Sequence, residues 1–334
     1  MIATAKERKA LDCHKCQFQD RGAWLRMRGQ SPWLGGSDAP TVWGVGWSSP
    51  YARFCEMSGL AERDDSPSYA MRRGTLMEPV VIEMFSTATG LTASPAGENP
   101  YVVYSSDDER PWFRCTPDSL VTVPESWDPF DGGLDSFGNP PPLPLDEMRL
   151  TTGLLQVKSL AGGFRMYEWD ARPPLKYAVQ CVHELMAADA PWGVLAVDFG
   201  HDCRWAWTAR NAGFEAKHMA KCEAFWGAVQ EKAWTAALDE SQATYDALQA
   251  QYEASKQDPP DALHLDTDCT KWVRQYDKAQ RAETEAKGLK TEARNNLCAM
   301  MGERTLAITP AGRKITWSEG SRGRTFRLSK EKKA

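Results

Sequence analysis

Two short segments, far apart in the chain, constrain the fold more than any other feature. The first, TPDSL, places Asp118 after a proline turn and before an apolar run, and the second, GLLQVKS, carries Gln156, Val157 and Lys158. Successive side chains of a β-strand point to opposite faces. Gln156 and Lys158 are therefore expected to share one face, with Val157 in the core. If the two strands pair, Asp118 joins an oxygen cluster beside one ammonium group, which suits a hard divalent cation.

The remaining pattern predicts helices on both sides of a mixed sheet, that is, an α/β fold. Residues 124–150 are rich in proline, glycine and aspartate and are expected to form an irregular surface insertion between two paired strands. Helices are expected at 1–30, 50–63, 71–90, 175–186 and 211–238, and strands in a hairpin over 100–123 and at 153–160, 193–198 and 204–208.

The 71–90 stretch predicts an amphipathic helix that ends at Gly90. Its expected apolar face consists of Leu76, Val80, Val81, Met84 and Phe85. Glu78 lies near that face. Its carboxylate is either solvated, or paired with an arginine, or turned inward toward a partner, because burying an unpaired charge is costly.

Composition changes after Trp234, and the chain is expected to form two domains, 1–238 and 239–334. The second is expected to be a helical arm, with helices at 240–256 and 270–301, followed by a basic, β-rich tail. The net charge of −5 argues weakly against a nucleic-acid partner, but 304–334 alone carries +7. The tail is either a phosphate-binding element or a solvated terminus, and the arm serves either oligomerisation or a partner.

Other functional classes are disfavoured. No apolar run is long enough for a membrane helix, and the N-terminus lacks the apolar core of a secretion signal. Nine scattered cysteines indicate the reducing cytoplasm rather than a disulfide framework. Cys13 and Cys16 have the spacing of half a zinc or iron–sulfur site, but no second pair of this kind accompanies them.

A glycine turn at Gly35 and Gly36 precedes Ser37 and Asp38, either of which is a good N-cap for the segment that follows. One interpretation is simply a capped helix. The other is a phosphate seat made of Arg28, the Ser37 hydroxyl and free backbone N–H groups.

Taken together, these motifs resemble the YqaJ-like viral recombinase family, which is similar to phage lambda exonuclease and lies within the PD-(D/E)xK nuclease superfamily. The resemblance covers about residues 24–235 and implies a restriction-endonuclease-like core. It rests on five blocks in order: Gly36-Ser37-Asp38-Ala39, Gly74…Glu78-Pro79, Pro117-Asp118-Ser119-Leu120, Gly153-Leu154-Leu155-Gln156-Val157-Lys158, and Tyr177…Gln180.

The resemblance implies a Mg²⁺-dependent exodeoxyribonuclease, with Mn²⁺ as a possible substitute. Such an enzyme would degrade linear double-stranded DNA from 5′ to 3′ in phage or prophage recombination, with metal-activated water as the nucleophile. The resemblance also implies a single-strand annealing protein as a partner, and a trimer as the oligomeric state. The resemblance implies metal binding by Glu78, Asp118, Gln156 and the Val157 carbonyl. It implies that Lys158 orients or deprotonates water, and that Gln180, with Tyr177 behind it, positions water or phosphate. It also implies that Arg28 and Ser37 grip the terminal phosphate.

Position 156 departs from the family pattern, which has glutamate there. Glutamine keeps a carbonyl oxygen that can ligate Mg²⁺ but lacks the charge, so a second ion would be held more loosely. The spacing also departs: 37 residues separate Asp118 from Gln156. Two alternatives therefore stay open, a non-catalytic protein that binds DNA ends and an endonuclease acting on modified or branched DNA.

Overall fold

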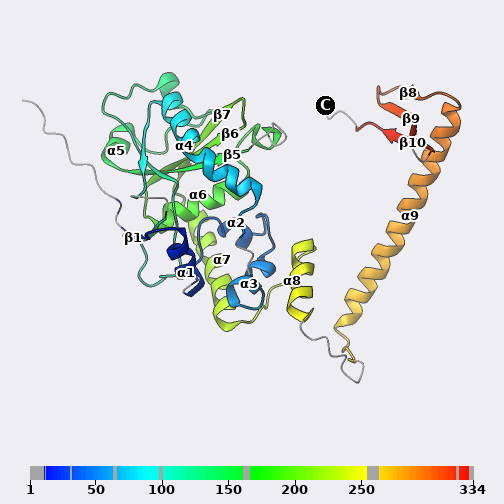
Figure 1. Cartoon of the computed structure of the whole chain (residues 1–334), viewed down its shortest axis with the longest axis horizontal. Helices are drawn as coiled ribbons and strands as arrows, with labels where there is room; N and C mark the ends of the chain where they lie inside the picture. Colours follow the sequence, from blue (N-terminus) through cyan, green and yellow to red (C-terminus); the bar gives the residue numbers. More distant parts are fainter. Residues whose placement is uncertain are drawn as a thin grey trace, which may run out of the picture. The chain divides into compact units, whose positions relative to one another are not determined.

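The computed structural model describes residues 11–330 except 12, 31, 63–65, 98–100, 161–165, 254–262 and 321–322, and no side chain at 28–30, 130, 131, 166 or 253. The chain divides into two compact units, Met1–Lys256 and Gln257–Ala334 (Figure 1). The first unit ends at Lys256 rather than at the predicted boundary of 238.

Helix α8 (Gln242–Glu253) accounts for that difference, because it packs on α3 (Pro50–Ser58) of the first unit. The Tyr51 hydroxyl donates a hydrogen bond of 2.5 Å to Gln251 Oε1 across this contact. A polar helix was expected here, but its docking depends on a partner about two hundred residues earlier in the chain, which local composition cannot indicate.

A mixed five-stranded sheet forms the centre of the first unit. Its strand order is β2 (Thr92–Pro95), β4 (Ser119–Thr122), β5 (Gly153–Ser159), β6 (Trp192–Asp198), β7 (Cys203–Ala209). Strands β5 and β6 run parallel, and the other neighbours are antiparallel. The predicted α/β fold with a mixed central sheet, and the predicted pairing of the Asp118 strand with the 153–159 strand, are confirmed.

Helices cover both faces of this sheet (Figure 1). Helix α4 (Tyr69–Thr89) packs Val81 and Phe85 against one face, where Val157 is also buried. Helix α6 (Leu175–Ala187) covers the other face, backed by α7 (Ala212–Glu231) and α2 (Ala39–Val42). The alternation expected for β5 is confirmed, since Val157 is buried on the α4 side.

The expected apolar face of α4 is wrong in part. Val81 and Phe85 are fully buried, but Leu76, Val80 and Met84 are exposed. Apolar residues surround more than one side of this helix, so periodicity alone could not select the buried side. The predicted end is correct, because Gly90 adopts a left-handed conformation (φ +73°) that favours glycine.

The N-terminal region differs from the expected continuous helix. Residues His14–Gln17 form β1, which pairs antiparallel with β3 (Val102–Ser105), and only α1 (Arg21–Gln30) is helical; residues 1–10 lie outside the described residues. The expected 100–123 hairpin is reduced to one bridge, Tyr104–Cys115, because β3 pairs with β1 instead. Helix α3 and helix α7 also end earlier than expected, at Ser58 and Glu231.

The 124–150 insertion is more regular than predicted. It contains a 3₁₀ turn, η1 (Phe130–Gly133), and a short helix, α5 (Leu145–Leu150). The buried carboxylate of Asp135 organises it by accepting backbone N–H groups of Phe137 at 2.9 Å and of Trp207, on β7, at 3.0 Å. The insertion is therefore fastened to the edge strand of the sheet.

The second unit contains α9 (Cys269–Met301) and an antiparallel sheet in the order β10 (Gly323–Leu328), β9 (Lys314–Gly320), β8 (Leu306–Ile308). This matches the predicted long helix followed by short basic strands. Arg324 lies 3.9 Å from the ring centroid of Trp317 and donates to the carbonyl oxygen of Gly302 at the end of α9. Among the described residues, no helix is both long and apolar enough to cross a membrane.

Candidate active site

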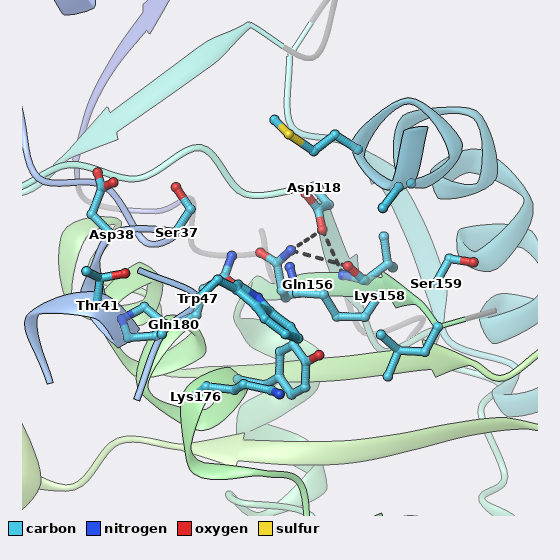
Figure 2. A pocket seen from close by; sticks show the side chains of 18 of the residues that line it. Ser37, Asp38, Thr41, Trp47, Asp118, Gln156, Lys158, Ser159, Lys176 and Gln180 are labelled. Carbon is cyan, nitrogen blue, oxygen red and sulfur yellow. Dashed lines mark hydrogen bonds between the residues drawn. The ribbon is translucent and has the colours of Figure 1, made fainter. Parts of the chain in front are cut away.

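A cavity of about 610 Å³ lies beside Asp118 and strand β5 (Figure 2). Eight of the nine residues proposed from the sequence line it: Ser37, Glu78, Asp118, Gln156, Val157, Lys158, Tyr177 and Gln180. The ninth is Arg28, whose side chain lies outside the described residues. The fold thus brings together side chains from α4, the start of β4, β5 and α6.

The pairing of β4 with β5 positions Asp118. Ser119 lies opposite Leu155, so the preceding Asp118 reaches the next residues of β5. Its Oδ2 atom accepts a hydrogen bond of 2.8 Å from the Val157 N–H and another from Gln156 Nε2. Figure 2 shows these bonds between Asp118, Gln156 and the β5 backbone. Asp118 is therefore held in a fixed orientation by the strand itself.

The Gln156 side chain is buried with its polar atoms unequally satisfied. Nε2 faces Asp118 Oδ2 and lies 3.4 Å from the Val157 carbonyl oxygen, whereas Oε1 is buried without a hydrogen-bond partner among the described residues. A buried, unpaired carbonyl is costly. The present amide orientation places the donor Nε2 against Asp118 Oδ2 and the Val157 carbonyl, and leaves Oε1 without a donor.

The donor set fits a hard divalent cation. Carboxylate and carbonyl oxygens are the ligands that Mg²⁺ takes in proteins, and Asp118 and the Val157 carbonyl present two of them to the same atom of Gln156. Half a turn of the amide would direct the orphan Oε1 toward the same place. Gln156 can therefore offer a third oxygen to this donor set.

Glu78 adds a second carboxyl from helix α4. Burial, and then the charge of Asp118, raise its pKa to about 7, while Lys158 opposes the shift. Burial also raises the pKa of Asp118, opposed by Lys158 and by the hydrogen bonds from Val157 and Gln156. Two neighbouring carboxyls that resist ionising together are stabilised by added positive charge, which again suits a cation.

Gln180 is held by an acid to which the sequence had given no role. Its Nε2 donates a hydrogen bond of 2.9 Å to Glu184 Oε1, one helical turn later on α6. Glu184 is 2% exposed, and burial together with the Asp118 charge raises its pKa to about 8. A Cβ on Gly36 would lie 2.5 Å from Glu184 Oε1, so a glycine is needed there. The four-residue spacing from Gln180 was the only sequence signal.

Ser37 is exposed on the cavity wall, and its neighbour Asp38 is buried. Asp38 precedes the four-residue helix α2, but its side chain makes no capping bond there. Instead it accepts the Gly35 N–H at 3.0 Å and pairs with the buried Arg53 at 3.0 Å. Asp38 therefore occupies the expected N-cap position but does not cap the helix with its side chain, and its partner Arg53 was missed. A phosphate role for Ser37 and Arg28 stays a prediction.

Aromatic and basic residues also line the cavity, and the sequence reasoning missed two of them, Lys176 and Trp47. Tyr177 is buried against Trp169, with ring centroids 5.2 Å apart, and its expected place behind Gln180 stays a prediction. Lys176 and the exposed Trp47 line the same cavity. Trp47 belongs to the α2–α3 loop, which carries no motif that would have indicated this position.

A second cluster consists of the buried residues His183, His218 and Cys222, and it is the one group of three potential metal ligands within the described part of the chain. Trp43 Nε1 donates to His218 Nδ1 at 2.8 Å, His183 Nδ1 and His218 Nε2 lie 3.0 Å apart, and His183 Nε2 lies 2.9 Å from the Arg114 carbonyl. Each ring nitrogen is used in this chain of hydrogen bonds, so the cluster is structural. Neither Cys13 nor Cys16 belongs to it.

Comparison with known families identifies the family of the chain. The model of the YqaJ-like viral recombinase domain matches residues 23–191, about half of the chain and a range that contains all nine proposed site residues. The chain belongs to this family, as the motif order had indicated. Membership supports a nuclease of phage-type recombination.

Solved structures give more distant matches. An alkaline exonuclease, LHK-Exo, from Laribacter hongkongensis is 16% identical with a TM-score of 0.42, and the match covers 63% of this chain and 92% of that one. LHK-Exo in complex with dAMP is 15% identical with a TM-score of 0.45, covering 64% and 94%. No curated protein sequence matches the chain.

Proposed function

We propose that this protein is a divalent-metal-dependent deoxyribonuclease that degrades one strand of linear double-stranded DNA from its 5′ end. The observation that carries the proposal is the convergence of Glu78, Asp118, the Val157 carbonyl and Lys158 on one cavity in a member of this family. Two acids and a carbonyl are suitable ligands for a divalent cation, and an ammonium group beside them can orient the attacking water.

Each residue of the site has a separate proposed role. Glu78 and Asp118 would hold Mg²⁺ or Mn²⁺, with the Val157 carbonyl and Gln156 Oε1 completing the set. When bound, such a cation lowers the pKa of a water molecule and offsets charge on the phosphate. Lys158 lies beside both acids, where it orients the attacking water.

Gln180 positions the scissile phosphate or the water, and Glu184 fixes its amide. Burial keeps Glu184 largely protonated at neutral pH, so it can hold Gln180 without adding negative charge near the phosphate. Ser37 and Arg28 would grip the terminal phosphate. This division assigns recognition of the strand end to α1 and the α2 entry, and chemistry to β4, β5 and α4.

The test is a strand-shortening assay with duplexes labelled at either the 5′ or the 3′ end, in Mg²⁺ and in Mn²⁺, with a circular duplex alongside. We expect early release of the 5′ label as short products, gradual shortening of the 3′-labelled strand, and no cutting of the circle. Cutting of the circle would favour the endonuclease alternative. Early release of the 3′ label would contradict the polarity.

One observation favours a second candidate, a non-catalytic protein that binds DNA ends. Gln156 Nε2 donates to Asp118 and faces the Val157 carbonyl, so a neutral amide hydrogen-bonds two of the oxygens that a metal ion would need. Binding of linear duplex without shortening in either metal would favour this candidate. The annealing partner and the trimer remain proposals of the family resemblance, and light scattering of the purified protein tests the trimer.

A further inference from the structure

Trp47 is a large aromatic side chain that lines the cavity and is largely exposed. It is 70% exposed, yet it lines the same cavity as Asp118, Lys158 and Gln180. Figure 2 shows it among the labelled site residues. Single exposed apolar residues are common, so exposure alone indicates nothing. Its location beside the groups proposed to cut DNA is what distinguishes it.

The loop that carries Trp47 is held at both ends. At its start Trp43 donates to His218 at 2.8 Å and stacks on Phe214, with centroids 4.8 Å apart. At its end the buried Ser49 caps α3 by accepting the Ala52 N–H at 3.0 Å. The loop therefore presents the Trp47 indole from a defined backbone.

Lys176 fixes the orientation of that indole. Its Nζ lies 4.3 Å from the Trp47 ring centroid and 5.1 Å from the Tyr177 centroid, and pairs with Glu168 at 3.5 Å. The Lys176 side chain is only 17% exposed, so its ammonium group is partly desolvated where it contacts the two rings. Cation–π attraction of this kind is worth most where the cation is partly desolvated.

An exposed aromatic ring beside basic groups is the arrangement on which proteins stack the bases of single-stranded nucleic acid. We propose that Trp47, oriented by Lys176, stacks on an unpaired base of the strand whose phosphate lies at Asp118 and Lys158. The inference rests on the proposed function for the nature of the ligand. Trp47 is then a positioning residue that sets where the strand sits relative to the scissile phosphate.

A chemical double-mutant cycle tests this inference without cleavage. In the Asp118→Asn background, with EDTA, binding is measured for a short 5′-phosphorylated single strand that carries 2-aminopurine at each of its first few positions in turn. We expect strong quenching at one position, lost in Trp47→Ala. The alanine variant should bind about 5- to 150-fold more weakly, from the usual strength of base–aromatic stacking.

The same strand with an abasic site at the quenched position completes the cycle. There Trp47→Ala should bind within about twofold of the parent, because the base that Trp47 contacts is gone. Trp47→Phe should recover most of the affinity. The matched control is Trp272→Ala, which removes another exposed tryptophan, 58% exposed on α9, and should leave both strands unaffected.

Equal losses on intact and abasic strands, or quenching that survives in Trp47→Ala, would overturn the stacking role. These outcomes are separable from the proposed function. If Trp47→Ala weakens binding only when the base is present, but no metal supports strand shortening, the stacking role stands and the nuclease proposal is overturned. If strands are shortened but the effect of Trp47→Ala does not depend on the base, the nuclease proposal stands and the stacking role is overturned. Absence of any DNA binding would overturn both.

Discussion

Replacing Gln156 with glutamate restores the missing charge, and the structure predicts opposite effects on stability without and with a divalent cation. Gln156 Nε2 donates to Asp118 Oδ2, so a glutamate would place a second carboxylate oxygen against Asp118. Two unit charges about 4 Å apart repel by about 4 kcal/mol at an effective dielectric of 20. Much of that is relieved if the pair shares a proton, leaving a cost of about 1–3 kcal/mol without metal.

With a divalent cation the sign reverses, because the added charge lies beside a site that already holds two acids. One further carboxylate ligand should lower the Mg²⁺ concentration for half-maximal cleavage at least about tenfold, which corresponds to about 1.4 kcal/mol. The variant should also be stabilised by Mg²⁺ more than the parent, since a ligand that binds only the native state raises its stability.

Two assays follow, the initial rate of strand shortening across a Mg²⁺ titration and thermal melting in EDTA and in Mg²⁺. The matched control is Gln242→Glu. Gln242 Nε2 donates to Asp246 at 2.7 Å, the same pair of groups in an exposed position on α8, so its effect should be small and independent of Mg²⁺. A Gln156→Glu variant that needs more Mg²⁺ than the parent would refute the assignment of Gln156 as a ligand.

Three further predictions concern other parts of the chain. Burial lowers the pKa of His183 to about 4 and of His218 to about 3. Because the unfolded chain then takes up protons at a higher pH than the folded chain, the free energy of unfolding should fall as the pH drops from about 6.5 toward 4. His218→Gln should flatten this pH dependence in thermal melts, and an unchanged slope would refute the prediction. Gly36→Ala should lower the free energy of unfolding in urea by about 1–3 kcal/mol, because the new Cβ would clash with Glu184. Gly227→Ala is the control and should not destabilise the protein, because open space surrounds that position. Equal effects of the two variants would contradict the prediction. Deleting 304–334 should flatten the salt dependence of DNA binding if the basic tail contacts phosphates, and an unchanged slope would exclude that contact.

The centre of the site was predictable because strand alternation is a strict local rule. One face of β5 is buried against α4, so Val157 had to face inward, and Gln156 and Lys158 then had to share the other face. The Pro-Asp turn before β4 placed Asp118 at the start of the neighbouring strand. A pattern within one strand and a pairing between two were enough to bring the three residues together.

Other parts of the structure depend on contacts that local pattern does not contain. The β1–β3 pairing joins segments almost ninety residues apart and competes with the helix that composition favoured. Glu184 can hold Gln180 only because the Gly36 backbone packs closely against its carboxyl group, and only the tertiary fold shows this contact. Trp47 lies in a short loop without periodicity, so nothing in its neighbourhood indicates that it borders the site.

The most direct test of the central claim is the cleavage rate of linear duplex in Mg²⁺ by Asp118→Ala and by Lys158→Ala, each shown by its melting transition to be folded. Asp146→Ala is the matched control, because that aspartate is 94% exposed on the insertion and only forms a surface pair with Arg149. We predict that both site variants lose cleavage and that the control keeps the parent rate. Cleavage at the parent rate by both folded site variants would contradict the account.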